Sequence, residues 1–367
     1  MCNQPRLFGI SHSNRDFTDP EVWGKNQFNS SFPAALACYM FSRNIMPVYI
    51  KADRNMNREL SYIAVDNLFG MNPLGDNTYY SFETQYTPFS GFIVGDIPRN
   101  DLVVQRLDTR ECVSSLEIKL TALPDQATFD LTEDEYGSEI VVRPDTIIYL
   151  ACSLIQSYNG SQAEIRAVLG NQTDEIEDWT DAREVIPHLR EIYQAIRGIV
   201  RAKYNSQKPI LMQPVWKTIG KSPRMPENCL DLFVWSDFGM LNMFMPSDSP
   251  NLSDIRHYTD RRGNVTIDRH TRTMVWLYKM LLDYAEDGQF DRERIIGAML
   301  YGPKNDKAFA SNGAKTHPVM TCAELSCPRI TRSEIKQIIL GGGQNLLSPE
   351  RRFDAIIFNS PDLFEED

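Results

Sequence analysis

The alternation of apolar and polar positions predicts a β-hairpin in the first third of the chain. An apolar strand begins at Asp101, and a second strand runs from Ser115 to Thr121 with strict alternation. Between the two strands, residues 108–111 (Asp-Thr-Arg-Glu) supply turn chemistry. In the second strand, one face carries Leu116, Ile118 and Leu120, and the other face, which we expect to lie opposite the core, carries Ser115, Glu117, Lys119 and Thr121.

Helices are predicted where apolar residues recur every three or four positions. The clearest pattern covers Glu184–Tyr204, with Val185, Leu189, Ile192 and Ile196 on one face. Further expected helices are Ser31–Arg43 (started by Ser31), Pro144–Ser157, Arg272–Glu286 and shorter ones near Arg292 and Thr331, and further expected strands are Pro47–Ile50, Gly91–Val94, Ile140–Val142, Ile210–Trp216 and Leu230–Trp235.

This order of elements predicts an α/β fold, a mixed central β-sheet flanked by helices with the hairpin at its centre. We expect residues 1–238 to form the core, and residues 239–367 to form a helical and loop-rich elaboration packed on it. With 367 residues, a single domain containing both parts is the alternative.

Composition narrows the class of protein. Seven cysteines at scattered positions do not form a disulfide framework, and no apolar run is long enough to cross a bilayer. The first residues lack the apolar core of a secretion signal, so a cytoplasmic location without membrane association is expected. No phosphate-binding loop motif occurs, which argues against ATP as a partner. His317, Cys322 and Cys327 have poor spacing for zinc.

The negative net charge argues against a nucleic-acid partner, but the distribution of the charges along the chain allows one. Lys and Arg number 38 against 49 Asp and Glu, a net charge of −11. Much of the acid is concentrated in residues 133–135, 174–181 and 365–367, whereas basic residues predominate over 256–279. Because affinity for DNA comes from locally clustered Lys and Arg, a duplex could lie along this basic stretch.

The hairpin itself carries the pattern of a metal-dependent phosphodiesterase. Residues two apart on a strand are separated by roughly 7 Å, so Glu117 and Lys119 lie side by side, and the hairpin brings Asp101 within reach of both. The carboxylates can hold a divalent cation and the ammonium can touch an attacking water. The alternative is a solvated sheet face. The second copy of the tripeptide, residues 334–336, fits a helix that begins near Thr331 and ends at the glycines 341–343.

Two stretches resemble a known family. Residues 8–17 with 23–33, and residues 100–104 with 114–125, are similar to type II restriction endonucleases of the PD-(D/E)XK superfamily, and within it to the HindVP family. The resemblance implies a homodimer that cuts double-stranded DNA at the palindromic site GRCGYC. It implies Mg²⁺ as cofactor, held by Asp101, Glu117 and the Ile118 carbonyl, with Lys119 as the catalytic lysine. Asn100 replaces the proline of the superfamily motif, which leaves Asp96 and Asp108 as alternatives for the first acid.

The residues that contact DNA are less defined by the sequence. Arg and Lys commonly contact guanine edges, and Asn and Gln contact adenine. A structure-specific repair or recombination nuclease, and a catalytically silent binder of nucleic acid or protein, remain alternative functions. The polar segment near residue 25 has an alternative interpretation, the start of a helix instead of a DNA-binding loop. The candidate DNA-binding residues are Lys25, Asn26, Gln27, Asn29, Arg256, Arg261, Arg262, Asn264 and Arg269.

Overall fold

The computed structural model covers the chain. The residues that it describes are 10–15, 25–52, 58–121, 139–203, 210–212, 217–219, 222–224, 232–235, 257–259, 261, 263, 265–301 and 309–312.

The predicted hairpin forms two strands of an antiparallel three-stranded sheet. The sheet has the order β3 (Thr78–Gln85), β5 (Arg99–Arg106) and β6 (Cys112–Leu116). In the turn after β5, the backbone N–H of Thr109 donates to Asp108 Oδ1 at 2.7 Å, and Arg110 adopts a positive φ of 61°. The prediction of a hairpin with its turn at residues 108–111 is therefore confirmed.

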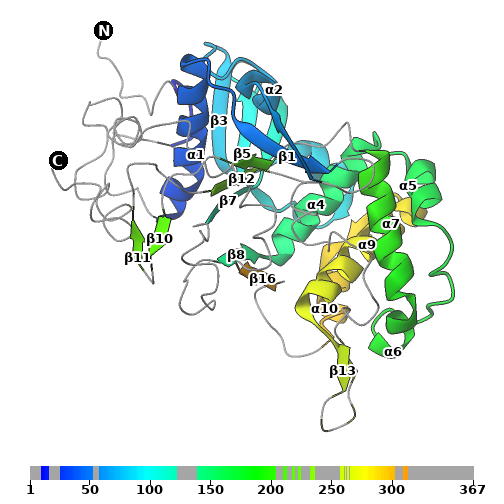
Figure 1. Cartoon of the computed structure of the whole chain (residues 1–367). Helices are drawn as coiled ribbons and strands as arrows, with labels where there is room; N and C mark the ends of the chain where they lie inside the picture. The colour runs from blue at the N-terminus through cyan, green and yellow to red at the C-terminus, as the bar shows by residue number, and fades with distance from the viewer. Residues whose placement is uncertain are drawn as a thin grey trace.

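Helices cover both faces of this sheet (Figure 1). On one face, Cys38 of α1 (Lys25–Ser42) places its Sγ 3.3 Å from the hydroxyl of Tyr80 in β3. On the other face, Tyr149 of α4 (Pro144–Ser157) donates its hydroxyl to the Ser115 carbonyl at 3.2 Å. Ser115 is fully buried and Glu117 is 6% exposed. The expectation that their face lies opposite the core is wrong, because α4 packs on that face too.

The remaining strands form small additional sheets. The strand β7 (Ile118–Thr121) pairs with β12 (Leu232–Trp235), and β8 (Glu139–Val142) pairs with β16 (Phe309–Asn312), both antiparallel. Within the described residues, two pairings are parallel. One joins the two-residue strands β4 (Ile93–Val94) and β15 (Phe290–Asp291), and the other is a single bridge between Ser13 and Tyr80. The mixed α/β class is confirmed, but in place of the predicted single central sheet the described strands form several small sheets, which are mainly antiparallel. The other strands are β1 (Val48–Ala52), β2 (Arg58–Tyr62), β9 (Ile210–Met212), β10 (Lys217–Ile219), β11 (Ser222–Arg224), β13 (His257–Thr259) and β14 (Val265–Ile267).

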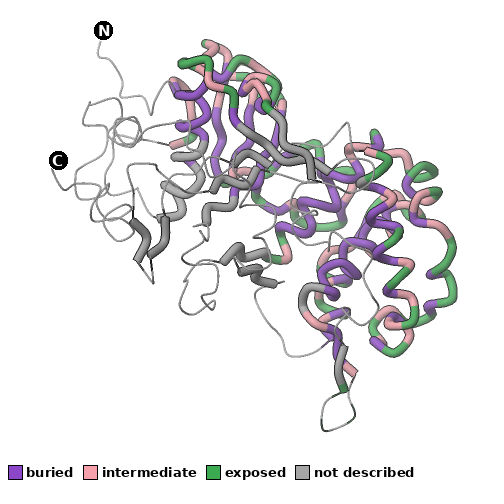
Figure 2. Tube along the Cα trace, in the orientation of Figure 1, coloured by how far each residue is buried: buried purple, intermediate pink, exposed green. Residues whose placement is uncertain are grey.

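A helical layer continues the core beyond α4. There, α9 (Arg269–Asp287) packs against α4, α5 (Gln162–Leu169) and α7 (Leu189–Ala202), and the buried residues of all four helices belong to one cluster (Figure 2). Residues 265–301 thus share a hydrophobic core with the first half of the chain. The predicted boundary near residue 239 lies outside the described residues. The shorter helices are α2 (Val65–Phe69), α6 (Ala182–Val185), α10 (Arg292–Ala298) and the 3₁₀ turns η1 (Thr87–Gly91) and η2 (Ile186–His188).

Trp276 of α9 provides a direct test of this shared core. Its side chain is fully buried, and its indole N–H donates to the Met299 carbonyl at 2.7 Å. We expect Trp276→Ala to lower the free energy of unfolding by about 3–5 kcal/mol, because the substitution opens a large cavity. Chemical denaturation measures the loss, with Trp276→Phe as the milder control. A loss below about 1 kcal/mol for Trp276→Ala, far under the usual cost of such a cavity, would contradict this packing.

Several predicted boundaries differ from the observed ones. The helix α1 begins at Lys25 rather than Ser31, and Ser31 is buried within it. The helix predicted over Glu184–Tyr204 is three shorter elements, since η2 contains Pro187, whose ring disfavours continuous α-helix. Along the stretches that the structure describes, no helix has the length and apolar character needed to traverse a bilayer. The helix expected near Thr331 and the group His317, Cys322 and Cys327 lie outside the described residues.

Candidate active site

Asp101 lies at the open end of the β5–β6 hairpin. Leu102 of β5 pairs with Leu116 of β6, so the next step of the antiparallel register places Asp101 beside residue 117. Asp101 Oδ2 accepts a hydrogen bond from the backbone N–H of Ile118 at 2.6 Å. The first candidate acid is therefore fixed against the peptide group that joins Glu117 to Ile118.

Glu117 occupies the break between two strands. The strand β6 ends at Leu116 and β7 begins at Ile118, where the chain changes its pairing partner from β5 to β12. Glu117 is 6% exposed, and its Oε1 accepts a hydrogen bond at 3.0 Å from the hydroxyl of Thr146 in the first turn of α4. Burying a carboxylate is unfavourable unless it is hydrogen-bonded or paired. The hydrogen bond from Thr146 therefore offsets part of the cost of burying Glu117.

Thr146 consequently provides a test of how Glu117 is held. We expect Thr146→Val to lower cleavage or cation affinity by about 10- to 100-fold, the usual cost of losing a group that orients a ligand. Thr146→Ser keeps the hydroxyl and should stay near the wild type. Plasmid cleavage and calorimetric cation titration measure the effect, and thermal unfolding checks that both variants fold. Equal values for the valine and serine variants would contradict this role.

Ile118 and Lys119 follow in β7. Their backbone pairs with Trp235 and Val234 of β12, respectively. The Lys119 side chain lies outside the described part of the chain, so its predicted place beside Glu117 stays a prediction.

The two alternatives for the first acid lie elsewhere. Asp96 is exposed in the segment between β4 and β5, where its carbonyl accepts from Arg292 at 3.1 Å. Asp108 is exposed in the turn at the opposite end of the hairpin, and the hydrogen bond from the Thr109 N–H lowers the pKa of its carboxyl. Of the three acids, Asp101 is the one whose carboxylate is hydrogen-bonded beside Glu117.

Sequence reasoning missed two charged residues close to Asp101. Arg15 donates to Glu83 Oε1 at 3.1 Å, and the charge of Asp101 also acts on the Arg15 guanidinium. Burial lowers the pKa of Arg15, while the hydrogen bond and charge of Glu83 and the charge of Asp101 oppose that shift. The segment containing Arg15 matched the family resemblance, but no local pattern indicated that it reaches this sheet.

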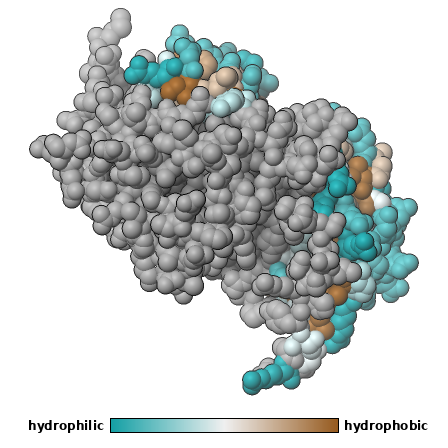
Figure 3. Space-filling view, in the orientation of Figure 1, coloured by the Kyte–Doolittle hydropathy of each residue, from teal (hydrophilic) through white to brown (hydrophobic). Residues whose placement is uncertain are grey.

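The candidate DNA-binding residues divide between two places. Lys25, Asn26, Gln27 and Asn29 lie in the first two turns of α1, and their side chains are outside the described part. Arg261 is exposed in the loop between β13 and β14, a hairpin that projects beyond α10 and ends in a hydrophilic tip (Figures 1 and 3). Arg269 is the first residue of α9, with an undescribed side chain, and Arg256, Arg262 and Asn264 lie outside the described residues.

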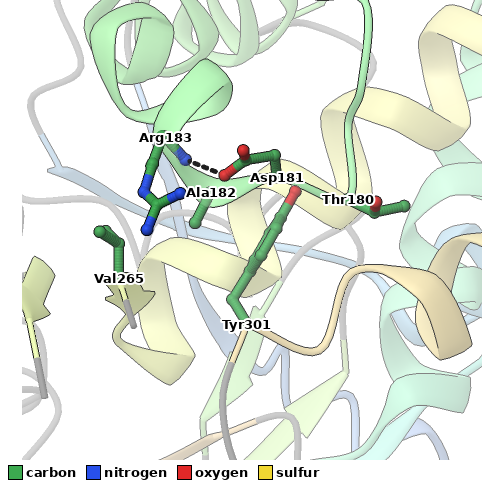
Figure 4. A pocket seen from close by; sticks show the side chains of 6 residues that line it. All are labelled: Thr180, Asp181, Ala182, Arg183, Val265 and Tyr301. Atoms are coloured by element: carbon green, nitrogen blue, oxygen red, sulfur yellow. Dashed lines mark hydrogen bonds between the residues drawn. The ribbon is translucent and has the colours of Figure 1, made fainter. Parts of the chain in front are cut away.

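A separate hollow lies at the base of the β13–β14 hairpin. Its volume is about 210 Å³, and it opens between α6, β14 and Tyr301 (Figure 4). Asp181 caps α6 by accepting from the backbone N–H of Arg183 at 2.9 Å, and both residues line the hollow. None of the lining residues belongs to the Asp101–Glu117 pair, so this hollow is not part of the candidate active site.

The donor set of the pair fits a hard divalent cation. In the described part of the chain, no three His, Cys, Asp or Glu side chains are grouped to hold a metal. Asp101 and Glu117 would thus supply two carboxylates, with main-chain carbonyl and water completing the shell. Mg²⁺ commonly keeps several waters and takes only one or two carboxylates from a protein, so the pair matches the needs of this ion.

Comparison with known proteins decides the family. The family model described as HindVP restriction endonuclease matches residues 23–364. The chain belongs to the HindVP restriction endonuclease family. It is 44% identical over 366 residues to the type II restriction enzyme HgiDI of Herpetosiphon aurantiacus, covering 100% of this chain and 99% of the relative. It is 43% identical over 364 residues to the probable type II restriction enzyme HindVP of Haemophilus influenzae, covering 99% and 96% respectively.

Membership in the HindVP restriction endonuclease family confirms two predictions. The family resemblance seen in the sequence is correct, and the chain is an enzyme of the endodeoxyribonuclease class. No solved structure matches the chain.

Proposed function

We propose that this protein is a Mg²⁺-dependent type II restriction endonuclease that hydrolyses phosphodiester bonds in double-stranded DNA at a short palindromic site. One observation carries the proposal: the Asp101 carboxylate accepts a hydrogen bond from the backbone N–H of Ile118, next to the buried Glu117. The chain that contains this pair belongs to the HindVP restriction endonuclease family. The HindVP relationship makes GRCGYC the first sequence to test. A homodimer in the cytoplasm is part of the proposal, because a two-fold protein matches a palindromic site.

The hydrogen bonds of Asp101 and Glu117 support a cation site at this pair. Asp101 and Glu117, with the Ile118 carbonyl, would hold the cation, and Thr146 fixes the Glu117 carboxylate from α4. Mg²⁺, when bound there, supplies charge compensation on the scissile phosphate and lowers the pKa of water. Lys119 would orient the attacking water with its ammonium group. The burial of Glu117 would keep bulk water away from that carboxylate and strengthen its electrostatic interactions.

The surrounding chain would recognise DNA. We assign phosphate or base contacts to the residues at the start of α1 and on the β13–β14 hairpin with its flanks, Lys25, Asn26, Gln27, Asn29, Arg256, Arg261, Arg262, Asn264 and Arg269. The exposure of Arg261 supports this for the hairpin. In the same proposal, residues 1–238 form a PD-(D/E)XK core, supported by the hairpin with helices on both faces, and residues 239–367 elaborate it.

Digestion of a sequenced plasmid tests the proposed function. The purified full chain is incubated with the plasmid and Mg²⁺, and the ends of the products are mapped. We expect discrete fragments whose ends share one palindromic sequence. A smear, or preference for branched DNA, would indicate a repair nuclease, and the absence of any cutting across several plasmids containing GRCGYC would indicate a silent binder. Either result would contradict the proposal.

A further inference from the structure

The segment 10–15 extends the central sheet alongside β3. Ser13 forms a parallel bridge with Tyr80, the Asn14 N–H donates to the Tyr80 carbonyl at 3.1 Å, and the Tyr80 N–H donates to the His12 carbonyl at 3.0 Å. The Asn14 side chain continues the pairing, since its Oδ1 accepts from the Phe82 N–H at 2.9 Å and its Nδ2 donates to the Phe82 carbonyl at 3.0 Å. These bonds fix the residue that follows, Arg15, at the end of the sheet where Asp101 lies.

Arg15 is a nearly buried cation. Its side chain is 8% exposed, its Nη2 donates to Glu83 Oε1 at 3.1 Å, and its Cζ lies 5.2 Å from the centroid of the Phe82 ring. The side chain of Glu83 is 41% exposed. Withdrawing a guanidinium from water is unfavourable unless an opposite charge and hydrogen bonds compensate for it. Glu83 is one such compensating charge.

Glu83 and Asp101 are neighbours across the sheet. Phe82 pairs with Leu102 and Thr84 pairs with Asn100, so Glu83 and Asp101 lie at the same level of β3 and β5, although they do not form a regular pair. Glu83 has a positive φ of 50°, a conformation that is uncommon for a non-glycine residue and that marks an irregularity in β3. The charge of Asp101 acts on Arg15 together with that of Glu83. Arg15 therefore forms an ion pair with an outer carboxylate and lies near the first acid of the proposed site.

We propose that Arg15 and Glu83 form a charge-compensated pair beside Asp101 that sets the affinity of the active site for its divalent cation. This inference rests on the proposed function. Arg15 acts through its charge and is not a catalytic residue, because its slight exposure leaves it little access to DNA and it is paired with the Glu83 carboxylate. Glu83 balances the charge of Arg15 so that the cation is not repelled from Asp101.

We expect substitutions of Arg15 and of Glu83 to change the affinity for Mg²⁺ in opposite directions. Arg15→Met removes a positive charge near the site, so the bound cation meets less repulsion and its affinity should rise. Glu83→Gln leaves the positive charge of Arg15 uncompensated, so the affinity should fall. At a separation of about 7 Å in water, a unit charge acting on a divalent cation changes its affinity by roughly fivefold. The double variant restores the balance and should return close to the wild type.

Calorimetric titration of the DNA-free full chain with Mg²⁺ tests the inference without relying on activity. The variants are Arg15→Met, Glu83→Gln and their combination, with thermal unfolding to check folding. The matched control is Arg106→Met with Glu111→Gln, an exposed ion pair of 3.4 Å in the same sheet at the turn end of the hairpin, which should leave Mg²⁺ affinity unchanged. If Arg15→Met does not fold, Arg15→Lys, which keeps the charge, should bind Mg²⁺ like the wild type, and Glu83→Gln alone should still bind more weakly.

The outcomes separate this inference from the proposed function. Opposite shifts in the single variants with recovery in the double variant support the pair. Unchanged affinities, or weakening in both single variants, overturn it and leave Arg15 as a structural residue, while the wild type still binds Mg²⁺ and cuts DNA. A wild type that neither binds Mg²⁺ nor cuts DNA overturns the proposed function and this inference with it.

Discussion

Replacing Asp101 by Asn, or Glu117 by Gln, is expected to reduce DNA cleavage about a thousandfold or more. Each substitution keeps the shape and one carbonyl oxygen, so the hydrogen bonds from Ile118 and Thr146 can persist while the negative charge is lost. Metal-assisted stabilisation of the transition state is worth several kcal/mol, and each 1.36 kcal/mol corresponds to about tenfold in rate. Single-turnover cleavage of a plasmid measures the loss, and gel-shift assays should show that specific DNA binding remains.

Asp108→Asn and Asp96→Asn are the matched controls for these substitutions. Both residues are exposed aspartates close in sequence to Asp101, and neither is hydrogen-bonded beside Glu117. Their cleavage rates should stay near the wild type. Normal cleavage by both the Asp101 and Glu117 variants would remove the assignment of the active site. A loss at Asp96 or Asp108 with a normal Asp101 variant would move the first acid to that position.

Removal of divalent cations is expected to abolish cleavage completely. Asp101 and Glu117 lie close together at one end of the hairpin, and without a cation their charges would repel the scissile phosphate of DNA. Cleavage is measured before and after treatment with excess EDTA, and again after Mg²⁺ is added beyond the EDTA concentration. Recovery in the last step shows that the protein stayed folded. Undiminished cutting in EDTA would exclude the proposed chemistry.

The local part of the site could be predicted from the sequence. The alternation in residues 115–121 and the turn residues 108–111 predicted the hairpin that brings Asp101 to Glu117, although the predicted strand is divided at Glu117 into β6 and β7. Such contacts arise between strands joined by a short turn, so pattern and spacing determine them. The helix Pro144–Ser157 was also predicted with the observed bounds, because proline favours the first turn and the apolar face is clear.

Long-range contacts account for what the sequence did not reveal. The strand β3 is not among the predicted strands, because its residues, Thr-Tyr-Tyr-Ser-Phe-Glu-Thr-Gln, are largely polar or aromatic, although aromatic and β-branched residues favour strands. The burial of Ser115 and Glu117 depends on α4 packing over their face. Arg15 reaches the site through pairing of residues 12–14 with β3, almost seventy positions away, which no local periodicity reports.

The strands beside the site pair with segments that follow much later in the chain. Lys119 lies on β7, which pairs with Leu232–Trp235, and β8 pairs with Phe309–Asn312. The chain continues from β8 into α4, whose Thr146 donates a hydrogen bond to Glu117. A ribosome releases the N-terminal residues first, and segments emerge in the order of their synthesis. The hairpin that carries Asp101 and Glu117 therefore leaves the ribosome well before the partners of its flanking strands. The pairing of β8 with β16 can form only after translation has passed residue 312.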